Sequence, residues 1–204
     1  MCATLAQRND VFFTVLFSCL CAQDPVLFSG SVRENLDPFD SFSDDALHTV
    51  LRQVNLHAHV AAMAEKDDAD GQAKAVAIDT HSVRSSLDAQ VTEAGGNFSL
   101  GQRQLICIAR ALLRQSKLVL LDEATSSVDV ETDNMIQSHM RSRFTSSTVI
   151  TVAHRINTII DSDRVLVLEH GRVAEFAPPH QLLAEPQSLF HALVHEHEHS
   201  RNAV

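Results

Sequence analysis

Two adjacent carboxylates, Asp122 and Glu123, are placed where they could take part in chemistry. They follow the apolar run Leu118–Leu121, which lacks polar alternation and is typical of a strand covered on both faces in a parallel sheet. Ligands of open α/β sheets bind beyond the carboxyl ends of the strands. The sequence therefore predicts both carboxylates at a ligand-binding edge, although such a pair taken alone is more often a helix cap or a solvated pair.

A helix is expected immediately before this strand. Ser99 and Gln102 have the S-x-x-Q spacing of a capping box, in which the serine hydroxyl accepts one unpaired backbone N–H and the glutamine reaches back to another. The following apolar residues repeat at helical spacing and form one stripe, with arginines lying off it. This stripe consists of Leu105, Ile108, Ala109 and Leu112.

A second strand is expected to bring further polar residues to the same edge. The run Thr148–Ala153 indicates a buried strand that ends at His154 and Arg155. Between the two strands, Met135, Ile136 and Met140 recur at helical spacing and predict a helix.

The most apolar stretch, Val11–Ala22, allows two interpretations. Its upstream Arg8 fits a secretory signal, whereas its content of β-forming residues fits a buried strand over Val15–Cys21. The stretch is too short to span a bilayer as a helix, and we favour the strand. The prolines and glycine of Gln23–Phe39 then predict a loop, a short strand and a second loop.

The segment after Phe39 divides into a regular and an irregular part. Ser43 is expected to cap a helix whose apolar face holds Leu47, Val50 and Leu51. The segment Glu65–Ser86 shows no sustained period and is expected to be a solvated insertion or a flexible loop.

The C-terminal part predicts a hairpin, a short helix and a tail. His170-Gly171 is a probable turn between strands Arg164–Leu168 and Arg172–Phe176. A closing helix is expected from Gln181. The tail holds several histidines, but without a cysteine or acidic framework a specific metal site is not expected there. These histidines are His191, His195, His197 and His199.

Composition limits the class of protein. A chain of 204 residues can form one domain with a good core, with or without a small lobe. The formal charge of −10 argues against non-specific nucleic-acid binding, which needs clustered lysines and arginines. The four cysteines show no C-x-x-C spacing, so free thiols in a reducing compartment are expected.

Four sequence motifs resemble those of a known family. They are FSLGQRQ at Phe98–Gln104, VLLDE at Val119–Glu123, SVD at Ser127–Asp129 and AHR at Ala153–Arg155. Their order and spacing resemble the nucleotide-binding domain of an ABC transporter. The segment QDPVLFSGSVRENLDPF, which starts at Gln23, is similar to exporters. Its LDPF, together with GQRQL and DEATSSVD, resembles the second nucleotide-binding domain of the multidrug-resistance-associated, or C, subfamily.

This resemblance implies an α/β fold, with a partial P-loop NTPase (RecA-like) core and the ABC α-helical subdomain. It divides the chain into a divergent segment 1–22, a partial nucleotide-binding domain 23–200, and a C-terminal helix and tail 181–204. Within the domain, about 40–100 would be the helical subdomain with an insertion at 65–86, and 101–180 would hold the core strands and helices.

The resemblance also implies a role for each residue that matches a family motif. Asp122 would hold Mg²⁺ and Glu123 would be the general base. His154 would be the switch histidine near the γ-phosphate. Gln23 would be the Q-loop residue that contacts Mg²⁺ and water and senses the transport domain. Asp129 would be the D-loop contact across a dimer.

The signature motif would be formed by Ser99, Leu100, Gly101 and Gln102, whose backbone N–H groups suit phosphate oxygens. The implied cofactors are ATP and Mg²⁺. The implied partners are a second nucleotide-binding domain and the transmembrane domains of an exporter, with no nucleic acid. The implied location is the cytoplasmic face of a membrane, reached through the transporter domains.

The phosphate cradle G-x-x-x-x-G-K-[ST] is missing, because none of the six glycines precedes a lysine. Two hypotheses follow. The chain is a fragment of the ATP-hydrolysing engine of an exporter of organic anions or drug conjugates, and binds ATP poorly alone. Alternatively, it is a catalytically incompetent module that docks on another ATPase domain and supplies its signature motif. A chromosome-maintenance ATPase fits poorly, since heptads and a basic face are absent.

Overall fold

The computed structural model describes residues 18–21, 25–69, 86–152 and 159–202. The chain divides into two compact units, Met1–Ile150 and Thr151–Val204, which we describe separately. No helix within the described ranges is both long and apolar enough to cross a membrane.

The first unit contains a three-stranded sheet in the order β1 (Ser18–Cys21), β4 (Leu118–Asp122), β5 (Thr148–Val152). Strands β1 and β4 are parallel, with Ser18 opposite Leu118 and Cys21 opposite Leu121. The predicted strands at these three places are therefore confirmed over the described residues. The parallel register brings the C-terminal ends of β1 and β4 to one edge of the sheet.

Burial of the sheet differs from the sequence prediction. In β4, Val119 and Leu121 are buried but Leu118 and Leu120 are only half-buried, so the prediction of cover on both faces was wrong for one face. The predicted burial of β5 was also wrong, because all five of its residues are exposed. The physical reason is that β5 ends the strand order of the described residues and its side chains are left uncovered; Ile150, for example, is 52% exposed.

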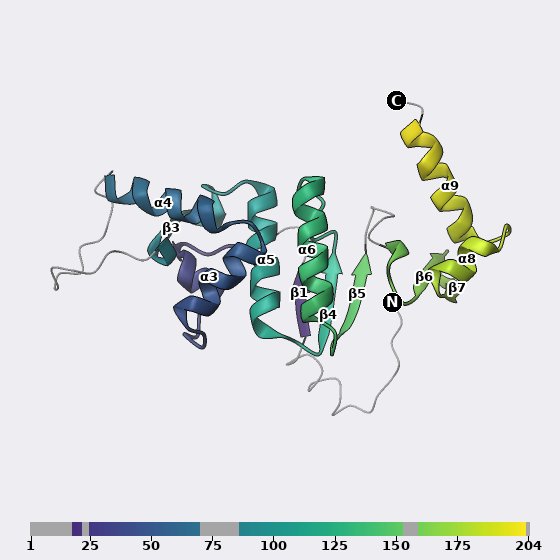
Figure 1. Cartoon of the computed structure of the whole chain (residues 1–204), viewed down its shortest axis with the longest axis horizontal. Helices are drawn as coiled ribbons and strands as arrows, with labels where there is room; N and C mark the ends of the chain where they lie inside the picture. Colours follow the sequence, from purple (N-terminus) through teal and green to yellow (C-terminus); the bar gives the residue numbers. More distant parts are fainter. Residues whose placement is uncertain (1–17, 22–24, 70–85, 153–158, 203–204) are drawn as a thin grey trace. The chain divides into compact units, whose positions relative to one another are not determined.

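Helix α5 (Leu100–Arg114) lies against β1 and α3 (Figure 1). Its predicted apolar stripe is confirmed, since Leu105, Ile108, Ala109 and Leu112 are all buried. The helix ends where Gln115 adopts a left-handed conformation with φ of 46°, and Lys117 then leads directly into β4. Its N-terminal turn therefore lies at the far end of the helix from this connection.

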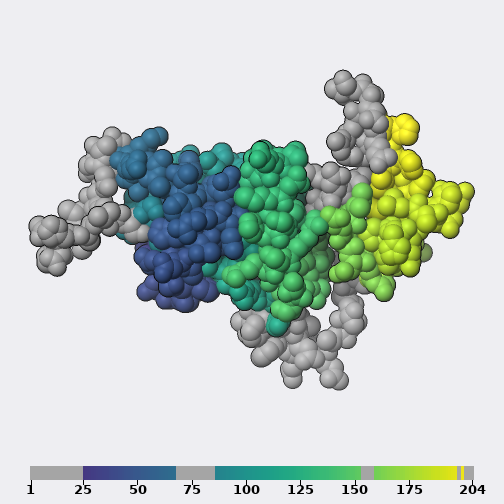
Figure 2. All heavy atoms as spheres, viewed as in Figure 1, coloured from purple at the N-terminus to yellow at the C-terminus, as the bar shows by residue number. Residues whose placement is uncertain are grey.

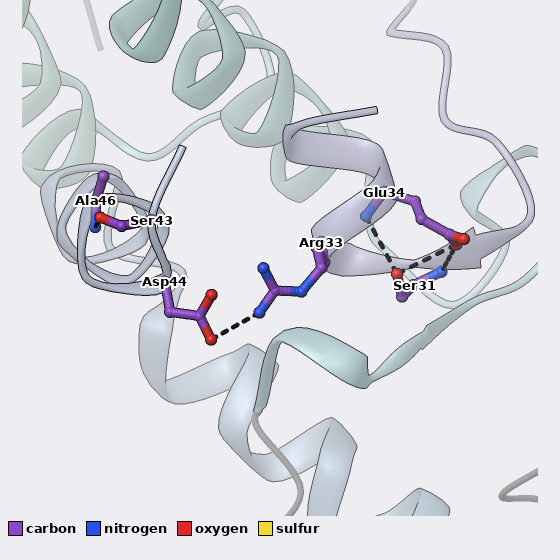
Figure 3. Close-up of polar contacts among 6 residues, drawn as sticks. All are labelled: Ser31, Arg33, Glu34, Ser43, Asp44 and Ala46. Atoms are coloured by element: carbon purple, nitrogen blue, oxygen red, sulfur yellow. Dashed lines mark hydrogen bonds and ion pairs between the residues drawn. The ribbon is translucent and has the colours of Figure 1, made fainter. Parts of the chain in front are cut away.

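A short helix precedes α3 and was missed by the sequence analysis. Strand β2 (Gly30–Ser31) leads into α2 (Val32–Leu36), where a loop was expected. Ser31 and Glu34 form a capping box, with Ser31 N–H donating to the glutamate at 2.7 Å and Glu34 N–H donating to the serine hydroxyl at 3.1 Å (Figure 3). The S-x-x-E spacing was visible in the sequence and could have predicted this helix.

Helix α3 (Asp44–Gln53) begins at Ser43, as predicted. The Ser43 hydroxyl accepts a hydrogen bond from the Ala46 N–H. Asp44 in the first turn forms an ion pair with Arg33 of α2 at 2.7 Å (Figure 3). The hydrogen bond that Arg33 donates to the Asp44 carboxylate in this ion pair raises the pKa of Arg33. The ion pair therefore joins the last turn of α2 to the first turn of α3.

Helix α4 (His57–Ala69) corrects the prediction of an insertion at 65–86. Residues 65–69 continue the helix, and the remainder to 85 lies outside the described residues. The sequence prediction missed α4, although Val60, Met63 and Ala64 recur at helical spacing; Val60 is buried, and Met63 and Ala64 are half-buried against the core. The chain continues through η1 (Ser86–Asp88), β3 (Gln90–Val91) and η2 (Glu93–Gly95), and β3 pairs antiparallel with β2.

One apolar core joins the helices of the first unit to β4. It extends from Leu36 and Leu51 through Leu112 to Val119 and Ile136. The predicted helix after β4 is confirmed as α6 (Val130–Arg143), with Ile136 and Met140 buried. Helix α3 also contacts α6, and the blue surface of α3 adjoins the green surface of α6 in Figure 2.

The second unit contains the predicted hairpin, formed by β6 (Val165–Glu169) and β7 (Arg172–Ala177). Its turn residues His170 and Gly171 both have positive φ, at 47° and 74°. Helix α8 (Pro179–Ala184) begins two residues before the expected Gln181. The expected tail is instead helix α9 (Leu189–Asn202).

Helix α9 is held by a carboxylate of the hairpin. Glu175 accepts hydrogen bonds from the N–H groups of Leu189 at 2.7 Å and Phe190 at 3.1 Å, and from the Ser188 hydroxyl at 3.0 Å. Phe190 and Val194 then pack in a small core with Val165. The tail prediction missed this helix because the helix-starting carboxylate comes from another element.

Candidate functional site

Asp122 and Glu123 lie at the C-terminal end of β4, as predicted. Asp122 is exposed, and its carboxylate has no hydrogen-bond or ion-pair partner within the described part of the chain. Glu123 is half-buried and adopts φ of 48°, which few residues other than glycine and asparagine favour. The chain turns sharply here, because the Ser126 N–H donates to the Glu123 carbonyl at 3.0 Å.

The start of α5 combines a closed cap with two backbone N–H groups that have no hydrogen-bond partner among the described residues. Ser99 N–H donates to the Gln102 side chain at 2.8 Å and Gln102 N–H donates to the Ser99 hydroxyl at 3.2 Å, which confirms the capping box. The N–H groups of Leu100 and Gly101 have no partner among the described residues. Leu100 is 41% exposed. This turn can therefore donate to an anion from the positive end of the helix.

The first turn of α5 contacts the loop that follows Glu123. A Cβ added at Gly101 would lie 2.5 Å from the Ser127 carbonyl oxygen, so no larger residue fits without movement. One turn later, the Gln104 side chain donates to the Ser126 hydroxyl and accepts from the Ser127 N–H, both at 3.1 Å. The signature-like turn and the loop are therefore in direct contact.

Asp129 ends this loop and caps α6. Its carboxylate accepts a hydrogen bond from the Thr132 N–H at 2.9 Å. This hydrogen bond, followed by a weaker contribution from the Thr132 hydroxyl, lowers the pKa of Asp129. The side chain is exposed, so a cap does not prevent it from also meeting a partner.

The predicted residues are brought together in part. Ser99–Gln102 and the loop ending at Asp129 are in contact, and Asp122 and Glu123 lead directly into that loop. Gln23 and His154 lie outside the described residues, so their predicted roles are neither supported nor opposed. A surface pocket of about 400 Å³ lies between α3, α5 and α6, and none of the predicted site residues lines it.

Sequence analysis missed a second contact of α5, made by Arg110. Its guanidinium donates to the carbonyl oxygens of Val26, at 2.9 Å, and of Asn35, and to the Asn35 side-chain oxygen at 3.0 Å. Asn35 is buried and also bonds both backbone groups of Phe28. The sequence pattern showed only that Arg110 lies off the apolar stripe of α5. Its partners could not be predicted, because they lie more than 70 residues away in the sequence.

Comparison with protein families identifies the family to which these motif residues belong. A family model described as ABC transporter matches residues 16–126, more than half of the 204-residue chain. The chain belongs to the ABC transporter family. Its α/β fold, with parallel strands ending near the motif residues, is the P-loop NTPase type of core found in that family.

Two curated proteins are similar to this chain, and the name of the second includes sub-family C. "Metal resistance protein YCF1" of Saccharomyces cerevisiae (strain ATCC 204508 / S288c) is 48% identical over 174 residues, which are 85% of this chain and 10% of that protein. "ATP-binding cassette sub-family C member 2" of Homo sapiens is 48% identical over 164 residues, 80% of this chain and 9% of that protein. The chain thus spans about a tenth of these relatives.

A solved structure shows the same fold. The chain of a bacterial Atm1-family ABC exporter with ATP bound superposes with a TM-score of 0.72 and 28% identity, covering 89% of this chain and 28% of that chain. Together with the relatives, this similarity shows that the chain has the fold of the ATP-binding domain of ABC exporters.

Proposed function

We propose that this chain serves one nucleotide with the start of α5 and a second with the end of β4. The observation that carries the proposal is the start of α5: the N–H groups of Leu100 and Gly101, which have no hydrogen-bond partner among the described residues, lie beside a closed Ser99–Gln102 cap. Two such amides at the positive end of a 15-residue helix are suited to phosphate oxygens. In the ABC family this motif faces the nucleotide held by a partner domain.

The end of β4 fits the other role. Asp122 presents an exposed carboxylate without a partner in the described ranges, and carboxylate oxygens suit Mg²⁺. Bound Mg²⁺ would neutralise phosphate charge. Glu123 follows directly and would accept a proton from the attacking water, and we assign Gln23 and His154 to the same nucleotide on their motifs alone. Asp129 would contact the partner domain.

The whole protein would couple ATP hydrolysis to export of organic anions or drug conjugates, the substrate class that the resemblance to the C subfamily implies. The transmembrane domains and the second nucleotide-binding domain would be its partners, and they would place it on the cytoplasmic face of a membrane. A specific observation supports a second candidate function. The sequence holds no G-x-x-x-x-G-K-[ST], which fits a module that only offers its signature turn to another ATPase domain.

ATP binding by the chain alone tests whether it holds a complete ATP site. Mg-ATP is titrated into the full 204-residue chain, and turnover is measured. Tight binding with turnover that is abolished by Glu123→Gln excludes both the division into two half-sites and the docking module. Weak binding without turnover is the result expected for both.

The start of α5 is tested with a partner. A complete ABC nucleotide-binding domain, loaded with Mg-ATP, is added, and association is measured by light scattering. Leu100→Asp places a negative charge where phosphate is expected but keeps the helix, because acidic residues are favourable at a helix N-terminus. This substitution should abolish association. Val173→Asp also replaces an exposed apolar residue by aspartate, but in the hairpin. It should leave association unchanged. Equal association of both variants would exclude the proposed phosphate contact.

A further inference from the structure

Gln104 is a polar side chain on the buried face of α5. It is 1% exposed and lies one turn after Gly101 and one turn before Ile108, so it occupies a position where the helix otherwise buries apolar groups. Burying an amide costs free energy unless its donor and acceptor groups are paired. Its hydrogen bonds therefore explain why glutamine is compatible with this position.

Two hydrogen-bond partners of the Gln104 side chain belong to the loop after Glu123. The amide nitrogen donates to the Ser126 hydroxyl, and the amide oxygen accepts from the Ser127 N–H, each at 3.1 Å. A backbone N–H can only donate, so the oxygen of the amide must face Ser127. One side chain thus fixes two successive residues of the loop.

Gly101 provides an independent second point of contact with the same loop. The 2.5 Å approach that an added Cβ would make to the Ser127 carbonyl oxygen shows that helix and loop backbones are in close contact there. The N–H of Ser127 is thus bound by Gln104, and its carbonyl oxygen is covered by Gly101. The loop then ends at Asp129, which caps α6.

We propose that Gln104 is a positioning residue that fixes the loop 124–129 against the start of α5, so that the Ser99–Gln102 turn and Asp129 present one continuous surface to a partner's nucleotide. This inference rests on the proposed function for its consequence, but not for its structural part. The proposal also places Gln104 between the two half-sites, because the loop 124–129 directly follows Glu123.

Hydrogen exchange of the full chain tests the structural part. Gln104→Leu keeps the volume but removes both hydrogen bonds. The Ser127 amide should then exchange about tenfold faster, beyond any change common to all amides. Ile108→Val, a buried substitution on the same helix face, is the matched control, and it should change protection across the core without singling out Ser127. Unchanged relative protection of Ser127 in Gln104→Leu would overturn the proposal.

Gln104→Glu separates positioning from general stability. The glutamate keeps an acceptor for the Ser127 N–H, and the Ser126 hydroxyl can rotate to donate to it. Burying a charge, however, should lower the midpoint of urea unfolding more than leucine does. Positioning therefore predicts that Ser127 is better protected in the glutamate variant than in the leucine variant, although the glutamate variant is globally less stable. The reverse order of protection would show a merely structural role.

Association with the Mg-ATP-loaded nucleotide-binding domain tests the consequence. Gln104→Leu should weaken association about tenfold or more, Gln104→Glu less, and Ile108→Val little. If the unsubstituted chain does not associate, the proposed function fails, and the exchange measurements still decide the role of Gln104. If it associates and Gln104→Leu associates equally well, the proposed function stands and this inference is wrong.

Discussion

Gly101 of helix α5 and Ser127 of the following loop approach so closely that a Cβ on Gly101 would lie 2.5 Å from the Ser127 carbonyl oxygen. The obstacle is backbone, which cannot rotate away as the end of a flexible side chain could. The contact therefore makes the start of α5 and the loop sensitive to the smallest possible change at position 101.

Gly101→Ala should destabilise the chain. Alanine favours a helix by up to about 1 kcal/mol, but overpacking against backbone costs about 1 to 3 kcal/mol, and we expect the clash to dominate. Urea unfolding measures the difference. Gly96→Ala is the control, since its Cβ would meet the Thr92 hydroxyl at 3.2 Å and the Glu93 carbonyl at 3.5 Å and should have a small effect. Equal stability of Gly101→Ala and the natural chain would show that the loop yields freely.

Arg110→Lys should lower the free energy of unfolding by about 2 kcal/mol, because hydrogen bonds to the carbonyls of Val26 and Asn35 need a planar fork that an ammonium group lacks. Arg114→Lys keeps the helix and the charge at an exposed position one turn further on. It should leave stability unchanged. A chemical-denaturation comparison checks both, and a similar small effect of the two substitutions would contradict a clamp at Arg110.

Glu175 should make the second unit sensitive to acid. Burial opposes ionisation of this carboxyl, but hydrogen bonds from Leu189, Phe190 and Ser188 outweigh it and lower its pKa below the ordinary value of 4.5. A lowered pKa in the folded state contributes stability above the unfolded pKa, and this contribution is lost as the pH falls through the folded pKa. Helix α9 should therefore loosen below about pH 4.5.

Glu175→Ala tests this expectation at neutral pH, where it should cost about 1 kcal/mol through loss of the helix-starting hydrogen bonds. Amide exchange of Leu189 and Phe190 is measured at pH 7 and pH 3.5. The natural chain should lose protection on acidification, whereas the variant should already lack it. Glu169→Ala is the control in the same hairpin, since its side chain has no hydrogen-bond partner in the described residues. Loss of protection in the control would point to the hairpin instead.

His59 should make the first unit less stable as the pH falls below about 6.5. Burial lowers its pKa, with a smaller contribution from Lys66. Its ring lies edge-on to Phe98 at 5.5 Å, and its Nε2 has no hydrogen-bond partner within the described residues. The unfolded chain therefore binds the proton more readily than the folded one, so stability rises with pH in this range.

His59→Leu should reduce that dependence and raise stability, because it removes an unpaired buried nitrogen. Part of the dependence should remain, because burial also lowers the pKa of His57. Thermal unfolding between pH 5.5 and pH 7.5 measures the effect. The substitution His139→Leu on α6 is a control for loss of a histidine elsewhere in the unit. An unchanged pH slope in His59→Leu would assign the dependence to other groups.

Sequence analysis predicted the parts of the fold that local patterns specify. The Ser99–Gln102 cap, the apolar stripe of α5 and the hairpin turn at His170 each depend on residues within a few positions of one another. By contrast, α9 begins at a carboxylate from β7, which lies in another element. The exposure of β5 depends on its place in the sheet, which sequence spacing does not give.

The candidate site shows the same division. Asp122 and Glu123 were found because a strand ends there, and Ser99–Gln102 because a helix starts there. Gln104 could have been found as a polar residue on an otherwise apolar stripe. Its partners Ser126 and Ser127 could not, since only the folded chain brings them within hydrogen-bond distance.

The bonds from Arg110 to Val26 and Asn35, with the pairing of β2 and β3, join segments that are far apart in the sequence. They close a large loop of chain that includes α3 and α4. The entropic cost of closing a loop grows slowly with its length, by about 0.6 kcal/mol for each doubling. Residues added or removed between β2 and β3 should therefore change the free energy of this closure very little. Length variation there can accumulate over evolution while the geometry at the start of α5 stays fixed.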